Sequence, residues 1–527
     1  MRLLPSIGRK ASVAPPAPVA VRPRRRLAPA GQRPIFRDAA RAELVRRVSD
    51  LQQAQRVETY AAAKTNRLTG DWSPAWSNIN DIIGASSPTV RNRVRQLVRD
   101  FPYFGNAVNK LVDYTVGDAI VYQARVKDGD GKLNTKLNQQ IEDAFRWWAD
   151  EADIAGKLHY YEIMRLMKRQ DVESGEFVLV KTISKNRNRY LPFCLQVFEA
   201  DWLATTSMLG ASTAAGDVLL EQGIEYRKAT GEVLAYHFTD PDGWGKTIRI
   251  PAENVLHGFQ TLRPGQLRGI SPLAPGVLVA HSLHDFLGSE IDAAKMAAKY
   301  LAIVKTPNPL ARQYGNTTTD TATGQKIETL ESAIIEYLRP GEEIEIAKNP
   351  RPGENFTPFV KLVLCMFAVT TGVPYELVSG DYGGLNYTVL RGVRNDFSHQ
   401  LRPIATRHVR QMAVPCVREF FESAWMMGRL DLPGYALEPR RYTTAAEYQP
   451  PGMDPIDPMR ETRAAVDAIK ALIRSPQEVV RARGRELEDV YREIQAAKEM
   501  AEQLGIAPQE ISKALAGNPA AVMEDQE

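Results

Sequence analysis

The chain has 527 residues, of which 44% are hydrophobic and 25% are charged, and its formal net charge is only +4. This length exceeds what one compact core supports and predicts three or four domains, while the small surplus of charge excludes a strongly basic DNA-coating protein. No apolar run approaches the 18 residues of a membrane-spanning helix. The cysteines (Cys194, Cys365 and Cys416) have no metal-ligand spacing, which predicts three reduced core residues and a reducing, cytosolic compartment.

The N-terminal segment, residues 1–39, is rich in proline, alanine and arginine and includes the run Arg24-Arg25-Arg26. Such a segment buries too little apolar surface to fold alone, which predicts a disordered basic arm. The arm is either a solvated tail or a contact for DNA or an acidic partner. Residues 40–66 are predicted to be helical, and residues 68–87 are predicted to form a tryptophan-bearing loop.

A clear helical pattern begins at Ser87-Pro88 and carries an arginine stripe, namely Arg91, Arg93, Arg95 and Arg99. The stripe has two interpretations: a phosphate-binding face, or a solvated or inter-subunit ion-pair face, which we favour. Further helices are expected over residues 137–150 and 160–170. Strands are expected over residues 177–180, 191–203, 223–227, 233–238 and 247–250.

The segment from Asp240 to Thr247 ends in Gly-Lys-Thr and resembles the end of a phosphate-binding loop. That motif needs a glycine where Asp240 stands, and a carboxylate there would repel the phosphate. The segment is therefore interpreted as a hairpin turn between two strands.

A long helix is expected after Gly269, with Ser271 as the N-cap and Pro272 in the first turn. About 30 residues give a helix of roughly 45 Å, which is too long for one small core, so part of its surface should pack against neighbouring subunits. His281 and His284 lie three apart on it, a spacing that allows either a metal site or a packed polar pair.

Residues 304–354 are more polar, with strands expected over residues 334–338 and 344–346. An apolar helix is expected over residues 356–370, ended by Gly372 and Pro374, and a glycine-rich loop follows before a helical pattern restarts at Val389. A long helix with kinks at Pro403 and Pro415 comes next. Residues 431–453 look irregular, and helices lie on both sides of a start signal at Ser475-Pro476.

Motifs of enzymatic chemistry are not found: the sequence contains no Gly-x-Ser-x-Gly elbow and no His-Glu-x-x-His pair. We therefore expect a protein without catalytic activity, cofactor or bound metal.

Two stretches carry a family resemblance: RNRVRQLVRDFPYFGNAVNKLVDYTVGD from residue 91, and GVPYELVSGD followed by NYTVLR from residue 372. They resemble lambda-type portal proteins of long-tailed double-stranded-DNA phages, and the likeness runs over residues 40–506. It implies an α+β, mainly helical, portal-type subunit. Its parts would be a wing (40–268), a stem helix (269–303), a small α/β clip (304–354), a second stem helix (355–377), a tunnel loop (378–388), a long helix returning to the wing (389–445), a helical crown (446–510) and a frayed tail (511–527).

The resemblance also implies a function. The chain would form a ring of about twelve subunits at one capsid vertex, through which double-stranded DNA is packaged and ejected and to which the tail is joined. Implied partners are the large terminase subunit, head-completion or connector proteins, and the major capsid and scaffold proteins, but no membrane. The ring would be assembled in the host cytoplasm and end up in the virion. The alternatives are a head-associated structural protein that does not form the channel and a hydrolase or nucleotidyl-transfer enzyme of the packaging machinery.

The site residues implied by the resemblance fall into two groups. The tunnel loop would present side chains and flexible backbone to passing DNA, through phosphate and sugar contacts rather than base stacking, or these are ordinary loop residues: Tyr382, Gly383, Gly384, Asn386, Tyr387 and Arg391. The clip would contribute basic side chains: Lys305, Arg312, Lys326 and Lys348.

Overall fold

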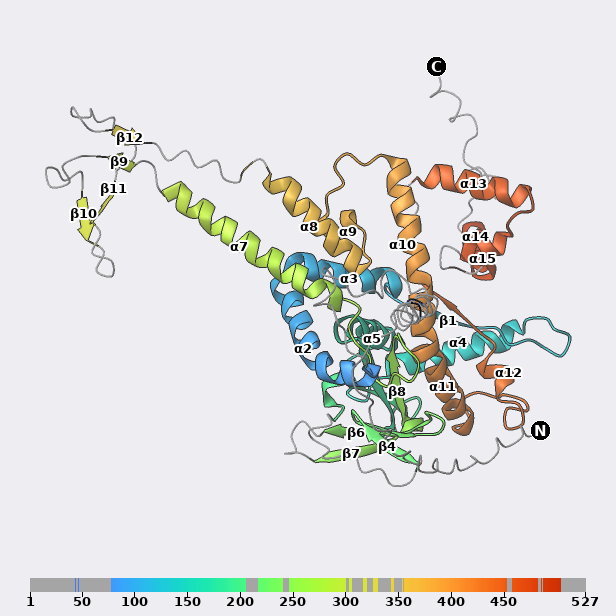
Figure 1. Cartoon of the computed structure of the whole chain (residues 1–527). Coiled ribbons are helices and arrows are strands. Elements are labelled where there is room, and N and C mark those ends of the chain that lie inside the picture. Colours follow the sequence, from blue (N-terminus) through green and yellow to red (C-terminus); the bar gives the residue numbers. More distant parts are fainter. Residues whose placement is uncertain are drawn as a thin grey trace, which may run out of the picture. The chain divides into compact units, whose positions relative to one another are not determined.

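A computed structural model of the chain describes residues 43, 46, 77–204, 217–239, 246–299, 303–305, 316–319, 326–329, 343–345, 353, 355–452, 457–481, 485 and 487–503 (Figure 1). The chain divides into two units, residues 1–76 and 77–527. Of the first unit only residues 43 and 46 are described, both as helical. The predicted basic arm, the rest of the helix expected over residues 40–66 and the start of the tryptophan-bearing loop therefore lie outside the described residues.

The second unit is a mixed helical and sheet structure in which helices predominate, as the sequence predicts. One core packs helices against a three-stranded antiparallel sheet of order β3-β2-β8. Its elements are α4 (Thr135–Asp150), α5 (Tyr160–Ser174), β2 (Glu176–Ile183), β3 (Phe193–Phe198), β8 (Val255–Phe259) and α11 (Val414–Met426). The apolar side expected for the helix over residues 137–150 is confirmed, since Ile141, Ala144, Phe145 and Trp148 are all buried.

A second antiparallel sheet has the order β4-β5-β6-β7 and a small apolar core of its own. Its strands are β4 (Val218–Glu221), β5 (Ile224–Arg227), β6 (Val233–Thr239) and β7 (Thr247–Pro251). Strands β6 and β7 pair antiparallel, with Thr239 opposite Thr247, so the hairpin interpretation of the glycine-lysine segment is confirmed. Strands β4 and β8 were not predicted.

Helix α2 (Ile79–Asp100) begins eight residues before the expected Ser87-Pro88 start. Asn78 is its N-cap, and the Asn78 side chain accepts a hydrogen bond from the Asn80 amide at 3.3 Å. Pro88 lies inside the helix, not at its start. The predicted start of the helix was wrong because Pro88 was taken as a first-turn residue, whereas the N-cap is Asn78, ten residues earlier.

The arginine stripe of α2 is not a solvated face throughout. Arg91 is buried and pairs with Glu176 at 3.1 Å and with Asp201 at 2.6 Å. Arg95 also pairs with Asp201, at 2.7 Å. Arg91 therefore joins α2 to β2, and both arginines join α2 to the 3-10 turn Ala200–Trp202 within one chain. The favoured interpretation, a solvated or inter-subunit face, was wrong for Arg91.

A second core joins α2, α3 (Pro102–Thr115), α7 (Val277–Lys299), α8 (Phe356–Thr371), α9 (Tyr375–Ser379) and α10 (Tyr387–His408). The long helix expected after Gly269 begins later than predicted, at Val277, after a 3-10 turn (Ala274–Gly276). The Ser271 hydroxyl accepts a hydrogen bond from the Leu273 amide and thus serves that turn. The 23 residues of α7 span about 35 Å, shorter than the 45 Å expected.

Four short strands belong to the segment between α7 and α8: β9 (Ile303–Lys305), β10 (Asn316–Thr319), β11 (Lys326–Thr329) and β12 (Glu343–Glu345). Strand β9 pairs with β12 and β10 pairs with β11, both antiparallel. The expected strand over residues 344–346 is confirmed as β12, one residue earlier, while the one expected over residues 334–338 lies outside the described residues.

Helix α10 continues through a π-helical segment (Val409–Ala413) into α11 (Figure 1). A long helical region was therefore predicted correctly. Pro415 is the second residue after the π segment and has no N–H to bond the carbonyl four residues earlier, which gives a physical reason for the wider turns there. Pro403 lies within α10.

The C-terminal part of the chain first packs against the first core and then continues into three further helices. After α12 (Arg440–Thr443), strand β13 (Ala446–Gln449) pairs with β1 (Val121–Ala124), so the expectation of irregular structure there was wrong. Helices α13 (Pro458–Lys470), α14 (Pro476–Arg481) and α15 (Leu487–Gln503) follow. The Ser475 start signal is confirmed, because its hydroxyl accepts a hydrogen bond from the Glu478 amide at 3.1 Å.

All three cysteines are free. Cys194 and Cys416 are buried as expected, and burial raises the pKa of the Cys416 thiol to about 12. Cys365 is partly exposed on α8, so the prediction of three core cysteines was wrong at this position. In the part of the chain that the structure describes, no helix is both long and apolar enough to cross a membrane.

Candidate functional site

The loop between α9 and α10 consists of residues 380–386 and is closed at both ends by capping residues. Gly380 ends α9 in the left-handed conformation, at φ 72°, and its amide bonds the Glu376 carbonyl at 2.9 Å. Asn386 is the N-cap of α10, with its side chain accepting a hydrogen bond from the Val389 amide at 2.9 Å. The loop is therefore a defined connection of seven residues between two helix ends.

Within the loop, short-range hydrogen bonds fold the backbone on itself. The Ser379 hydroxyl accepts from the Asp381 amide at 3.1 Å, and the Asp381 carboxylate accepts from the Gly383 amide at 3.0 Å. Gly384 has φ 77°, a conformation that other residues rarely adopt. The Tyr382 side chain remains 49% exposed at the tip of this turn.

The other expected loop residues belong to the start of α10. The helix begins at Tyr387, not at Val389 as predicted, because the Asn386 cap was not recognised. The Tyr387 ring is partly buried, and the guanidinium of Arg460, from α13, lies 5.8 Å from its centroid. Arg391 is exposed one turn further along. The structure thus brings Tyr382, Gly383 and Gly384 together in the loop, and it sets Asn386, Tyr387 and Arg391 on the helix.

A residue far away in the sequence fixes the first end of the loop. The Asn106 side chain, on α3, donates hydrogen bonds to the carbonyls of Leu377 and Val378, both at 2.9 Å. Carbonyls in the last turn of a helix have no partner within that helix, so Asn106 satisfies two of them. Sequence reasoning missed Asn106, because its partners lie about 270 residues away and leave no local signal.

The basic residues expected in the clip are only partly described. Lys305 lies on β9 and Lys326 on β11, which belong to different strand pairs. Arg312 and Lys348 lie outside the described residues.

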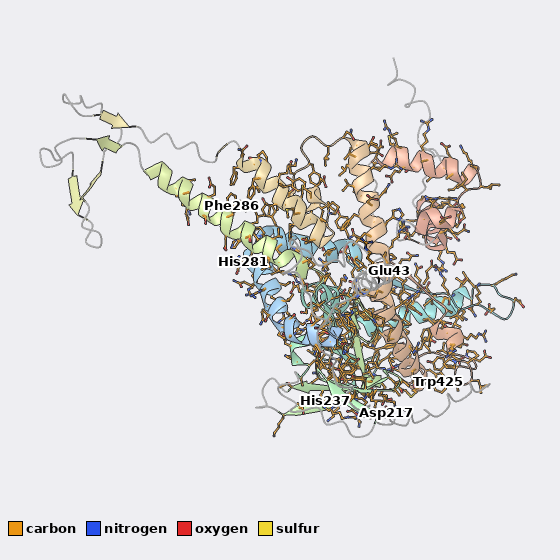
Figure 2. All side chains as sticks on the ribbon, viewed as in Figure 1. Glu43, Asp217, His237, His281, Phe286 and Trp425 are labelled. Atoms are coloured by element: carbon orange, nitrogen blue, oxygen red, sulfur yellow. The ribbon has the colours of Figure 1, made fainter. Side chains whose placement is uncertain are left out.

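The histidines of α7 do not form a common site. The His281 ring, labelled in Figure 2, pairs with Asp285 at 3.0 Å. The His284 ring packs against Phe101, with ring centroids 5.3 Å apart. Among the described residues, no three His, Cys, Asp or Glu side chains are arranged to hold a metal ion.

A second surface of interest is an apolar ridge along α8. Four large side chains recur at spacings of three, four and three residues and are 48–83% exposed: Phe359, Leu362, Met366 and Val369. This spacing places them on one face of the helix, as in the seam of a coiled coil. A contiguous exposed apolar face of this kind is typical of a protein–protein contact.

Comparison with known proteins gives a consistent result. Residues 65–404 match the family model described as phage portal protein, lambda family. The chain is 26% identical over 486 residues to a probable portal protein of Halomonas phage phiHAP-1, covering 89% of this chain and 91% of that protein. It is 20% identical over 463 residues to portal protein B of Escherichia phage lambda, covering 80% of this chain and 85% of that protein.

A search of solved structures found similarity to a chain in the neck of an empty gene transfer agent particle, at 15% identity and a TM-score of 0.44. That match covers 77% of this chain and 93% of the other. A chain in the neck of the native particle matches with a TM-score of 0.43.

Proposed function

The chain belongs to the lambda family of phage portal proteins, and on this premise we propose that it forms a homo-oligomeric ring whose channel carries double-stranded DNA. Neither the family nor its relatives named above are described as enzymes. The proposal assigns residues 77–268 to a wing, α7 and α8 to a stem, the strands β9–β12 to a clip, residues 380–386 to a tunnel loop, and α13–α15 to a crown.

The observation that carries the ring is the apolar ridge of α8. Val369 is 83% exposed and Leu362 is 60% exposed, although both are large apolar side chains. Each apolar side chain covered by a neighbour contributes about 25 cal/mol per Å² of surface removed from water. A second copy of the chain is the partner that a ring supplies at every subunit, so the ridge is assigned to the contact between adjacent subunits.

The ridge is tested by the double variant Leu362→Asp/Val369→Asp. Two carboxylates cannot be buried in an apolar contact without a large cost, so this variant should remain monomeric while keeping its circular dichroism spectrum. Ile183→Asp is the matched control, because Ile183 is 76% exposed on β2 and away from the ridge. Native mass spectrometry of both variants gives the answer: rings that persist in the double variant would refute this assignment.

The loop at residues 380–386 is assigned to the narrow part of the channel, where Tyr382 contacts phosphate and sugar transiently. The modest net charge of +4 suits a channel through which DNA passes without being held tightly, since phosphate contacts add up steeply. The clip is assigned to docking of the large terminase subunit during packaging and of head-completion or connector proteins afterwards. Contacts with the major capsid and scaffold proteins, assembly in the host cytoplasm and a final place at one capsid vertex complete the proposal.

A further inference from the structure

A cavity of about 440 Å³ lies among α3, α5 and α10, where α3 packs against both other helices (Figure 1). This volume is within the range of small-ligand pockets. Two basic side chains line the cavity, Lys168 from α5 and Arg407 from α10, and its described lining contains no carboxylate. Other parts of the wall are apolar, including Leu111, Val172 and Ile404. The cavity therefore offers positive charge in a partly apolar enclosure.

Lys168 is a buried cation with spare hydrogen-bond donors. Its side chain is 3% exposed, and within the described residues only the Asp171 carboxylate accepts from its Nζ, at 2.6 Å. An ammonium group has three donors, so the other two have no acceptor there. Burial lowers the pKa of Lys168 in spite of the opposing attraction of Asp171. A charge held out of water in this way is costly unless further acceptors surround it.

The charges around Lys168 do not balance. Arg407 donates to the same oxygen of Asp171, Oδ2, at 2.7 Å, so one carboxylate serves two cations. His408 adds no charge at neutral pH, because burial lowers its pKa to about 4. The group of Lys168, Asp171 and Arg407 therefore keeps an excess of positive charge, which an anion in the adjoining cavity would balance.

A hydroxyl in the cavity wall also lacks a partner. Thr115, on α3, is fully buried, and its Oγ1 has no hydrogen-bond partner within the described part of the chain. A buried hydroxyl without a partner costs free energy, and such groups are rare in folded proteins. Three different helices thus each contribute a hydrogen-bond donor to one cavity, through Thr115, Lys168 and Arg407.

We propose that this cavity binds a phosphate group, either free inorganic phosphate or the phosphate of a nucleoside monophosphate. Its oxygens accept hydrogen bonds from Lys168, Arg407 and Thr115, and its charge balances the excess positive charge. Donors from three helices suit a tetrahedral phosphate, whose oxygens point in different directions, better than a planar carboxylate. Gln260 and Gln400 also line the cavity and carry amide donors. The site lies within one subunit, so it does not depend on the proposed ring.

Isothermal titration calorimetry of the full-length chain tests the proposal with inorganic phosphate, adenosine monophosphate and acetate, all at one ionic strength set with NaCl. At least one phosphate compound should bind saturably and more tightly than acetate. Binding of inorganic phosphate alone identifies free phosphate as the ligand, whereas equal or tighter binding of adenosine monophosphate identifies a nucleotide. The proposal is overturned if neither phosphate compound binds up to about 10 mM, or if acetate binds as tightly.

The variant Thr115→Val separates ligand binding from folding. Because the Thr115 hydroxyl has no partner among the described residues, its removal should not lower the stability of the ligand-free chain in urea denaturation. The affinity for the phosphate compound should fall about tenfold or more, since a hydrogen bond to a charged group is lost. Thr406→Val is the matched control, because the Thr406 hydroxyl donates to the Arg402 carbonyl at 2.9 Å and does not line the cavity. Equal affinities of the wild type and both variants would overturn the assignment.

Discussion

The buried carboxylate of Glu176 joins segments that are far apart in the sequence. It accepts hydrogen bonds from Arg268, at 2.9 and 3.0 Å, from Arg91 at 3.1 Å, and from the Gly269 amide at 2.9 Å. The His257 ring lies at 3.1 Å. Burial alone would raise the pKa of this carboxyl, but Arg268 and His257 outweigh burial and hold the pKa well below its usual range. The cluster thus ties α2 and the sheet to the segment that leads into α7.

Replacing Glu176 by Gln should lower the free energy of unfolding by about 3–5 kcal/mol, because it leaves the buried Arg268 guanidinium without its counter-charge and removes one of the two carboxylates that pair with Arg91. The control Asp143→Asn removes a carboxylate whose partner, Arg146, is 69% exposed, and should change stability by less than about 1 kcal/mol. Urea denaturation of both variants checks the difference. Equal, small effects would mean that the buried cluster adds nothing to stability.

A buried histidine predicts a dependence of stability on pH. The His408 ring nitrogen Nε2 lies 3.1 Å from the Met164 carbonyl, and the ring packs against Phe177. Burial, followed by the charge of Lys168, lowers the pKa of His408 to about 4, against the opposing effect of Asp171. The unfolded chain takes up this proton near pH 6.5, so stability should fall as pH decreases from about 6.5 to about 4.

From pH 7 to pH 5 this histidine should cost about 2 kcal/mol of unfolding free energy. The variant His408→Gln keeps a side-chain donor for the Met164 carbonyl but does not titrate. Its loss of stability between the two pH values, measured by urea denaturation, should be smaller than that of the wild type by about that amount. If the variant and the wild type lose the same amount of stability between pH 7 and pH 5, His408 is not the group that causes the loss.

At the scale of elements, the loop at residues 380–386 depends on an anchor outside it. Removing the Asn106 side chain by Asn106→Ala leaves the Leu377 and Val378 carbonyls without their donor. Hydrogen exchange across residues 377–386 should become faster, and the local free energy of opening should fall by about 1 kcal/mol. Asn109→Ala, also on α3, removes a contact with Arg169 instead and should leave the exchange of the loop unchanged. Unchanged exchange in the Asn106 variant would contradict the anchoring role.

Deleting residues 382–385 tests the role of the loop itself. Both capping residues, Gly380 and Asn386, remain, so α9 and α10 should still form and rings should still assemble. Packaging or retention of DNA should be impaired, because the narrow part of the channel is lost. Particles that fill and retain DNA normally would refute the tunnel-loop assignment.

The elements that the sequence predicted well are those with a local signal. The helix over residues 137–150 follows from its apolar period, and the end of α8 follows from Gly372, which adopts φ 72°. The pairing of β1 with β13 could not be predicted, because more than 300 residues separate the two strands. The start of α2 was missed because a cap at Asn78 outweighs the signal at Pro88.

The features of the candidate site can likewise be separated into those that the sequence marks and those that only the structure shows. Glycines and tyrosines marked the loop from the sequence, but the anchor at Asn106 and the contact of Arg460 with Tyr387 arise only from tertiary packing.

At the scale of the whole molecule, the proposed ring accounts for large apolar side chains that remain exposed on one subunit. Beyond the ridge of α8, large apolar side chains on α13 and in the turn after it are also exposed, including Met459, Leu472 and Ile473, at 75–92% exposure. No residue described in α13 is buried. Helices with apolar side chains and no buried residue need a partner, which a neighbouring subunit supplies in a ring.

The central claim is most directly tested by native mass spectrometry of the purified full-length chain together with electron microscopy. The account predicts closed rings with a central hole and a mass near a dozen times the 58.7 kDa of one chain. A compact monomer or dimer without a central hole, under conditions in which the protein is folded and concentrated, would contradict it.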